Sequence, residues 1–167
     1  MRLRALIFDD EASIQHILGV ACVRRGYEVF TFPDPRLCPP QGMDRCRCPA
    51  GVTCTDIIIA DLNMPQIHGL DFFEALFAKG CVAPYLALMS GAWSEPDEAR
   101  ALRLGCWLFT KPFTFGQLDA WFTTVESLLP PDRQLLTVGA PEWRGQPTAA
   151  ERRPQPAAPD SSAFPSG

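Results

Sequence analysis

The fold is decided by the stretch Ile57 Ile58 Ile59 Ala60 Asp61 Leu62 Asn63 Met64 Pro65. Its first four residues form a short apolar run, which is typical of a parallel strand that is buried on both faces. The run ends at a carboxylate, and polar groups just past the carboxyl ends of parallel strands face the crevice where ligands bind. Pro65 disfavours a helix at Met64, and Gly69 allows a tight turn before the next helical pattern. This stretch therefore predicts a strand, a reactive loop and a helix.

Outward from this stretch, strand patterns alternate with helix patterns along the chain. Further strands are predicted at residues 5–8, 27–32, 85–89 and 107–110. Apolar residues at helical spacing follow four of the five strands, and the last two helices begin at the capping residues Ser94 and Thr114. Alternating strands and helices predict a doubly wound α/β fold, with a five-stranded parallel sheet flanked by helices.

Length and composition predict one folded domain followed by a tail. The chain has 167 residues, of which 47% are hydrophobic, enough for one core of ordinary size. Eight prolines follow Leu129, and a segment of this composition cannot bury enough apolar area to offset the entropy of ordering. We therefore expect a domain at residues 1–131 and a disordered tail at 132–167, with no covalent output domain. Within the tail, Leu135, Leu136, Val138 and Trp143 could dock locally.

Charge and hydropathy exclude several kinds of partner. A net charge of -4 gives no general attraction to nucleic acid or to an anionic membrane, and no motif for either is present. No apolar run approaches the roughly 20 residues that span a bilayer. The apolar run before Asp9 is also too short for a signal peptide. These features predict a cytoplasmic protein.

Polar side chains at the predicted strand ends form a candidate site. Asp9 and Asp10 follow the first strand, Asp61 the third, Ser90 the fourth and Lys111 the fifth. In this fold they converge on one crevice. Three carboxylates repel one another unless a cation joins them, and hard oxygen ligands suit Mg²⁺. Such a site could neutralise a phosphoryl group arriving at Asp61, with Ser90 and Lys111 donating to it.

Each of these residues also has a plain structural interpretation. Asp9 and Asp10 could cap the first helix, Ser90 could satisfy backbone groups in a turn, and Lys111 could be a solvated cation. The site hypothesis is favoured because polar residues stand at the carboxyl ends of four predicted strands, and these ends meet in one crevice.

The same residues resemble the receiver domain of bacterial two-component response regulators, over about residues 3 to 129. The resemblance is carried by Phe8 Asp9 Asp10, by Ile59 to Pro65 with Gly69, by Ser90 Gly91, and by Lys111 Pro112 Phe113. It implies a flavodoxin-like receiver fold. It also implies a phosphoacceptor protein that supports its own phosphotransfer and dephosphorylation, rather than an enzyme acting on a separate substrate.

The resemblance further implies a role for each site residue. Asp61 would be phosphorylated by a sensor histidine kinase or a phosphotransfer protein. Asp9, Asp10, Asp61 and the main-chain carbonyl of Asn63 would hold Mg²⁺. Ser90 would move toward the phosphoryl group and reposition a protein-binding face for a downstream protein target. The Lys111 to Pro112 peptide could be cis.

Two features depart from the family pattern. An aromatic residue often stands three positions before the lysine, but here that position is Leu108, flanked by Trp107 and Phe109. The family's second helix is largely replaced by a segment at 33–55 with five prolines and four cysteines. We expect this segment to be a local specialisation.

The cysteines of this segment are Cys38, Cys46, Cys48 and Cys54. Four thiolates could hold a structural Zn²⁺ and order the loop, although the spacing is not the usual C-x2-C. Redox-responsive disulfides and free thiols are the alternatives. Cys22, Cys81 and Cys106 are expected to be small buried hydrophobes. A rival function follows, in which the cysteines make the receiver fold a metal or thiol sensor that works without phosphorylation.

Overall fold

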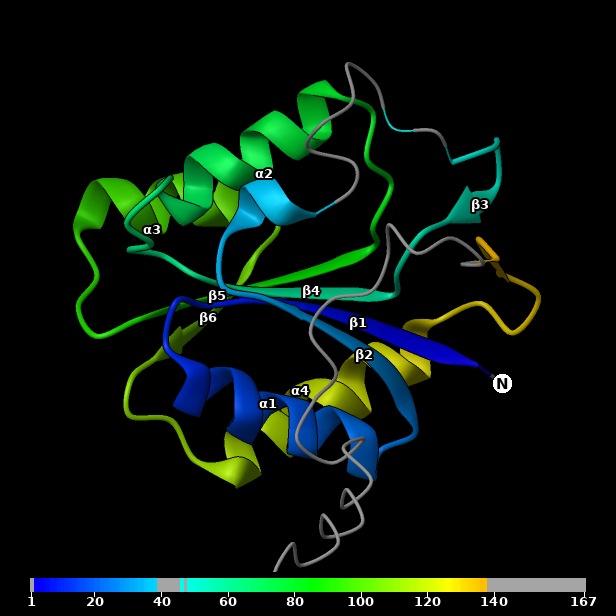
Figure 1. The fold of residues 1–167 in the computed structure, drawn as a ribbon, viewed down its shortest axis with the longest axis horizontal. Coiled ribbons are helices and arrows are strands. Elements are labelled where there is room, and N and C mark those ends of the chain that lie inside the picture. The colour runs from blue at the N-terminus through cyan, green and yellow to red at the C-terminus, as the bar shows by residue number, and fades with distance from the viewer. Residues whose placement is uncertain (1, 39–45, 47, 138–167) are drawn as a thin grey trace, which may run out of the picture.

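Five parallel strands form the central sheet of the computed structural model, which describes residues 2–38, 46 and 48–137 (Figure 1). The strands are β1 (Leu3–Phe8), β2 (Tyr27–Phe32), β4 (Ile57–Asp61), β5 (Tyr85–Ser90) and β6 (Trp107–Thr110). They lie in the order β2-β1-β4-β5-β6, and every neighbouring pair is parallel. The predicted five-stranded doubly wound sheet is therefore confirmed.

Helices cover both faces of this sheet. They are α1 (Ala12–Arg24), α2 (Gly69–Ala78), α3 (Glu95–Arg103) and α4 (Phe115–Leu128). Figure 1 shows α1 and α4 on one face, with α2 and α3 on the other. The buried apolar residues accordingly form two clusters, one on each side of the sheet.

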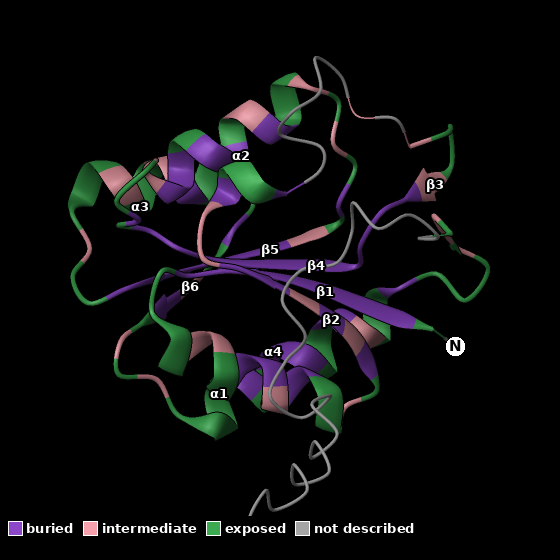
Figure 2. Ribbon diagram, in the orientation of Figure 1, coloured by how far each residue is buried: buried purple, intermediate pink, exposed green. Residues whose placement is uncertain are grey.

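The central strand β4 is buried along its whole length (Figure 2). Ile57 and Ile59 belong to the cluster with α1 and α4, whereas Ile58 and Ala60 belong to the cluster with α2. Successive side chains of a strand point to opposite faces, so a strand covered on both sides must be apolar throughout. This explains why the run of β4 does not alternate with polar residues.

Side-chain caps begin the last two helices, as predicted. The Ser94 hydroxyl accepts the Asp97 N–H at 3.2 Å at the start of α3. At the start of α4 the Thr114 hydroxyl accepts the Gln117 backbone N–H at 3.2 Å, and the side-chain Oε1 of Gln117 accepts the Thr114 backbone N–H at 2.7 Å. These bonds satisfy N–H groups that have no partner within the helix.

A 3-10 turn and a short strand occupy the described part of the segment between β2 and β4. The turn is Pro35–Leu37, and the strand is β3 (Val52–Thr53). The described residues of this segment contain no α-helix, in agreement with the expected replacement of the second helix. Residues 39–45 and 47 lie outside the described part of the chain.

The ordered domain extends past the boundary expected at residue 131. Strand β7 (Gln134–Leu135) pairs in parallel with β3, with Val52 opposite Gln134 and Thr53 opposite Leu135. The expectation of disorder therefore fails for residues 132–137, because these residues form backbone and ionic contacts with the domain. The rest of the expected tail, 138–167, lies outside the described residues.

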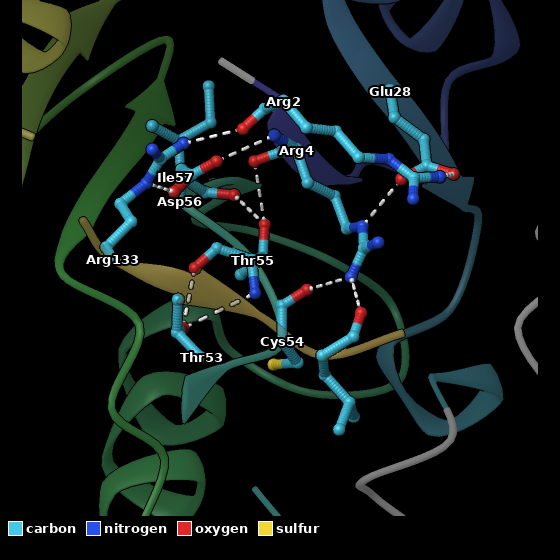
Figure 3. Close-up of polar contacts among 10 residues, drawn as sticks. Arg2, Arg4, Glu28, Thr53, Cys54, Thr55, Asp56, Ile57 and Arg133 are labelled. Carbon is cyan, nitrogen blue, oxygen red and sulfur yellow. Dashed lines mark hydrogen bonds and ion pairs between the residues drawn. The ribbon is translucent and has the colours of Figure 1, made fainter. Parts of the chain in front are cut away.

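A buried arginine joins this C-terminal segment to the sheet (Figure 3). The Arg4 guanidinium donates to the carbonyl oxygens of Cys54 at 2.8 Å and Leu136 at 2.9 Å, and to the Glu28 carboxylate at 2.8 Å. The buried Asp56 carboxylate accepts the Arg4 backbone N–H at 2.8 Å and pairs with Arg133. A buried charge is tolerated only where it is paired and hydrogen-bonded, so these contacts depend on one another.

The turn between β4 and α2 brings Gly69 against the backbone of β4. Its N–H donates to the Leu62 carbonyl at 2.7 Å. A Cβ atom at Gly69 would lie 2.5 Å from the Asp61 carbonyl oxygen, closer than real contacts allow. The glycine is thus required by this close approach, in addition to the tight turn expected from the sequence.

Within the described part of the chain, no helix is both long enough and apolar enough to cross a membrane.

Truncation after residue 131 should destabilise the domain, because Asp56 and Arg4 would lose partners while remaining buried. We expect the free energy of unfolding to fall by roughly 2–4 kcal/mol. Denaturant unfolding would measure the change. Truncation after Thr137 is the matched control and should leave stability near that of the full chain. Equal midpoints for the two truncations would show that these contacts contribute nothing.

Gly69→Ala should lower the free energy of unfolding by about 1–3 kcal/mol, because the added methyl group must displace the backbone at Asp61. Gly116→Ala, in the first turn of α4, is the matched control. The nearest atom to its added Cβ is the Thr114 hydroxyl at 3.8 Å, so stability should stay level or rise by up to about 1 kcal/mol. Thermal unfolding of both variants would test this, and an unchanged Gly69→Ala protein would contradict the close approach.

Candidate functional site

Four strands of the main sheet have their carboxyl ends on one edge of the sheet (Figure 1). A polar residue stands at each of these ends. Asp9 follows β1, Asp61 ends β4, Ser90 ends β5 and Lys111 follows β6. Because the strands are parallel and in register, with Asp61 opposite Met89 and Ser90 opposite Thr110, these residues reach the same edge. The strand-end placement expected from the sequence is therefore present.

Lys111 connects two of the carboxylates. Its ammonium group donates to Asp61 Oδ1 at 2.6 Å and to Asp9 Oδ2 at 3.1 Å. Glu11 lies farther from the same nitrogen, at 3.9 Å. Burial lowers the pKa of Lys111, but the hydrogen bonds and charges of Asp61 and Asp9 outweigh it and hold the pKa above its ordinary value. The lysine is therefore charged, and it neutralises part of the carboxylate charge.

Backbone N–H groups bind the remaining carboxylate oxygens. Asp9 Oδ1 accepts the Glu11 N–H at 2.8 Å, and Asp61 Oδ2 accepts the Asn63 N–H at 2.7 Å. Burial raises the pKa of Asp9, while the Glu11 N–H and Lys111 lower it, and burial prevails. Gln15 also supports this loop, because its side-chain amide donates to the Asp9 carbonyl at 2.6 Å. No sequence pattern indicates this role for Gln15, which lies on α1 at ordinary helical spacing.

Ser90 is fully buried and is bound to its own loop. Its hydroxyl donates to the Ala92 carbonyl at 2.5 Å and accepts the Ala92 N–H at 3.2 Å. The Asn63 side-chain amide lies 3.5 Å from the same oxygen, which is a long contact. Ser90 thus lies at the site but is satisfied by a local turn. The Lys111 to Pro112 peptide is cis.

Asp10 lies next to this group without joining it. It is exposed, whereas Asp9 and Asp61 are buried. In the described residues no three side chains of His, Cys, Asp or Glu are arranged so as to hold a metal ion. The structure therefore brings together Asp9, Asp61 and Lys111, with Ser90 on the neighbouring strand.

The donor set nevertheless fits Mg²⁺. This ion commonly takes one or two carboxylates and completes its shell with water and phosphate oxygens. Asp9 and Asp61 approach one cationic nitrogen from two strands, so they already lie within reach of a shared cation. The exposed Asp10 carboxylate and the carbonyl of exposed Asn63 are available beside them.

The cysteines lie away from this site, beyond the other end of β4. Cys54 comes three residues before β4, and its thiol interacts with the thiols of Cys48 and Cys81. The Cys48 thiol also interacts with Cys46. Cys81 was expected to be a small buried hydrophobe. It packs against the apolar core but is only half-buried, and its thiol interacts with that of Cys54. A four-thiolate zinc site is not formed by the described residues and stays a prediction.

Comparison with known proteins identifies the family. A family model described as the response regulator receiver domain matches residues 5–122. A "Probable transcriptional regulatory protein" of Picosynechococcus sp. is 32% identical over 71% of this chain and 47% of its own length. The alkaline phosphatase synthesis transcriptional regulatory protein SphR of Synechococcus elongatus is 30% identical over 70% of this chain and 46% of its own length. The chain spans about half the length of these relatives.

Solved structures agree with this match. The chemotaxis protein CheY4 of Vibrio cholerae superposes with a TM-score of 0.59 at 25% identity, covering 75% of this chain and 99% of that chain. A response regulator receiver protein of Pseudomonas putida has the same fold, with a TM-score of 0.61 at 22% identity, over 74% of this chain and 98% of that chain. The chain belongs to the response regulator receiver domain family of two-component signalling, a family of phosphoacceptor signalling modules.

Proposed function

We propose that this chain accepts a phosphoryl group on Asp61 from a sensor histidine kinase or a phosphotransfer protein and thereby switches its binding to another protein. The observation that carries the proposal is the Lys111 ammonium, held between Asp61 and Asp9 at the carboxyl ends of three strands. A cation beside a carboxylate nucleophile is suited to the charge that develops during phosphoryl transfer.

The Asp61 carboxylate is prepared for nucleophilic attack by its contacts. One oxygen is bound by Lys111 and the other by the Asn63 N–H, so the carboxylate is held in one orientation. In the transfer, a phosphorus–oxygen bond to Asp61 forms as the phosphorus–nitrogen bond of the donor histidine breaks. Mg²⁺ bound by Asp9, Asp10, Asp61 and the Asn63 carbonyl would supply further neutralisation of phosphoryl charge. Water later attacks the phosphorus atom, the bond between phosphorus and the Asp61 oxygen breaks, and inorganic phosphate leaves as the carboxylate is restored.

Ser90 and Lys111 would bind the new phosphoryl group and respond to its charge. The Ser90 hydroxyl must leave its hydrogen bonds to Ala92 before it can donate to a phosphoryl oxygen on Asp61. Loss of the hydrogen bonds between Ser90 and Ala92 releases the loop that leads to α3. This loop contains the half-buried Trp93. The local turn and the phosphoryl group thus compete for one hydroxyl, which gives the loop two arrangements.

An apolar surface beside the site suits the phosphodonor protein. A pocket of about 460 Å³ is lined by Ile14 and Ile17 of α1, by Lys111 to Phe113 and by Phe115. Ile17 and Phe115 are exposed. Exposed apolar residues next to a reactive group are typical of a protein-binding surface.

We place the reaction in the cytoplasm, with protein partners and without direct nucleic-acid or membrane binding. The downstream target is a protein of unknown identity.

Acetyl phosphate with Mg²⁺ should add one phosphate to the wild-type chain and none to Asp61→Asn, because only Asp61 is held as the nucleophile. Intact-mass spectrometry would measure the addition, and chelation of Mg²⁺ should prevent it. Asp71→Asn is the matched control, since Asp71 is an exposed carboxylate of α2 paired with Arg100. Phosphorylation of Asp61→Asn at the wild-type level would refute the assignment.

Lys111→Met should still be phosphorylated but should respond weakly, because the ammonium group that senses the phosphoryl charge is gone. We expect the phosphorylation-dependent change in tryptophan emission to fall at least about threefold, as the lysine links the charge to the switch. Emission would be recorded at equal phosphate content, determined by mass. Glu11→Gln serves as the control, since Glu11 lies 3.9 Å from the same nitrogen and is exposed. A full response in Lys111→Met would count against this role.

A further inference from the structure

Four cysteine thiols meet beside the amino end of β4, outside the proposed phosphoacceptor site. Cys46 and Cys48 belong to the segment before β3, Cys54 follows β3, and Cys81 follows α2. The Cys46 thiol interacts with Cys48 and Cys81, the Cys48 thiol with Cys54 and Cys81, and the Cys54 thiol with Cys81. The buried Cys38 thiol also lies near Cys46 and Cys81. The Cys46 N–H also donates to the Lys79 carbonyl at 2.6 Å, which holds this segment against the end of α2.

The thiols form a cluster of mutual neighbours. A zinc ion needs thiolates that converge on a common centre. The described residues contain no three such ligands arranged for a metal ion, and every cysteine is a free thiol. Neighbouring free thiols are instead arranged for chemistry between two sulfur atoms. The observations therefore favour a redox pair over a metal site.

Cys48 and Cys54 are the pair best placed for this chemistry. The Cys48 sulfur lies near both the thiol and the backbone N–H of Cys54, and both favour its charged form. Cys54 is buried, whereas Cys48 is half-buried and lines an open pocket of about 400 Å³. A small oxidant can therefore reach Cys48 first, with a second thiol waiting behind it. Cys81 is less suited, because it packs against the core under α2.

We propose that Cys48 and Cys54 form a reversible disulfide when the protein meets hydrogen peroxide. The Cys48 sulfur attacks one peroxide oxygen, the oxygen–oxygen bond breaks, and water leaves as a sulfenic acid forms. The Cys54 sulfur then attacks the Cys48 sulfur, the sulfur–oxygen bond breaks, and a second water leaves with the Cys54 proton. The two thiols together lose two hydrogen atoms, and one peroxide is reduced to two waters. A dithiol reductant reverses the change.

The electrostatics of the pair agree with this geometry. Hydrogen bonds from Cys54 and Cys46 stabilise the Cys48 thiolate, against the opposing effect of burial, and lower the pKa of Cys48 to about 6. A thiolate is the reactive form of cysteine, and a partly exposed thiol of low pKa is typical of redox-sensitive sites.

The disulfide would act on the surface that carries β3. The segment 49–53 lies between the two cysteines, forms part of the pocket wall and includes β3, which pairs with β7. Linking Cys48 to Cys54 joins both ends of this segment and restricts the pocket, which Leu129, Pro130 and Gln134 line from the C-terminal side. The inference does not depend on phosphorylation, and Asp61→Asn should be oxidised like the wild type.

The full chain, purified under reducing conditions without a chelator, provides the test. Elemental analysis should find far less than one metal ion per chain. After removal of reductant, one equivalent of hydrogen peroxide should remove two hydrogen atoms from the intact mass. Trypsin cuts after Arg47 and Lys79, so a disulfide between Cys48 and Cys54 stays within the peptide 48–79. A link to Cys81 would instead join that peptide to 80–100.

Variants distinguish the roles of the two thiols. Cys54→Ser should leave Cys48 as a sulfenic acid that dimedone traps, and Cys48→Ser should leave Cys54 unmodified. Cys106→Ala is the matched control, because Cys106 is buried without a thiol neighbour that shifts its pKa, and it should oxidise like the wild type. In the wild type, Cys48 should react with peroxide at least about tenfold faster than Cys106.

Three results would overturn the proposal. One is a stoichiometric zinc or iron content that protects the thiols from alkylation. Another is a disulfide that joins 48–79 to 80–100. The third is a fully alkylated Cys48 after treatment with peroxide. Circular dichroism of each variant would confirm that the domain is folded, and the wild-type peptide map decides the question even if one variant is unstable.

Discussion

The complete burial of β4 between β1 and β5 is the constraint on which the rest of the structure depends. Both faces of this strand are covered, so no polar side chain can be placed before its last residue without losing hydration. The first polar side chain of β4 is therefore Asp61, at the edge where β1, β5 and β6 also end. The same constraint requires Gly69, because the chain turns back against the backbone it has just left. The candidate site is thus a consequence of how the sheet is covered.

Much of this could be predicted from the sequence, because the signals are local. An apolar run that stops at a carboxylate identifies both the strand and its functional end, and the same logic placed Asp9, Ser90 and Lys111. The capping residues Ser94 and Thr114 are local signals as well, and both predictions are confirmed. What the sequence could not supply is the distance between groups. It did not separate Asp10, which is exposed, from Asp9, which is buried and bound by Lys111.

The features that were missed all depend on contacts between distant segments. Arg4 is a charged residue in a buried strand, and its partners Cys54 and Leu136 lie 50 and 132 residues away. Residues 132–137 look like a polar tail because their apolar content is low, yet they are held by Arg133 and by the short strand β7. Cys81 reads as a small hydrophobe after a helix, and only the packing of α2 brings it to Cys54. No local pattern carries this information.

Helix α2 connects the two reactive regions of the molecule more directly than β4 does. Its first residue, Gly69, touches the carbonyl of Asp61, and Cys81 follows its last residue, Ala78, by three positions. A ten-residue helix spans about 15 Å. The Asp61 carboxylate and the cysteine cluster therefore lie toward opposite ends of one helix. The site of phosphoryl chemistry and the thiols are separated by its length, so a change in one group of side chains makes no direct contact with the other.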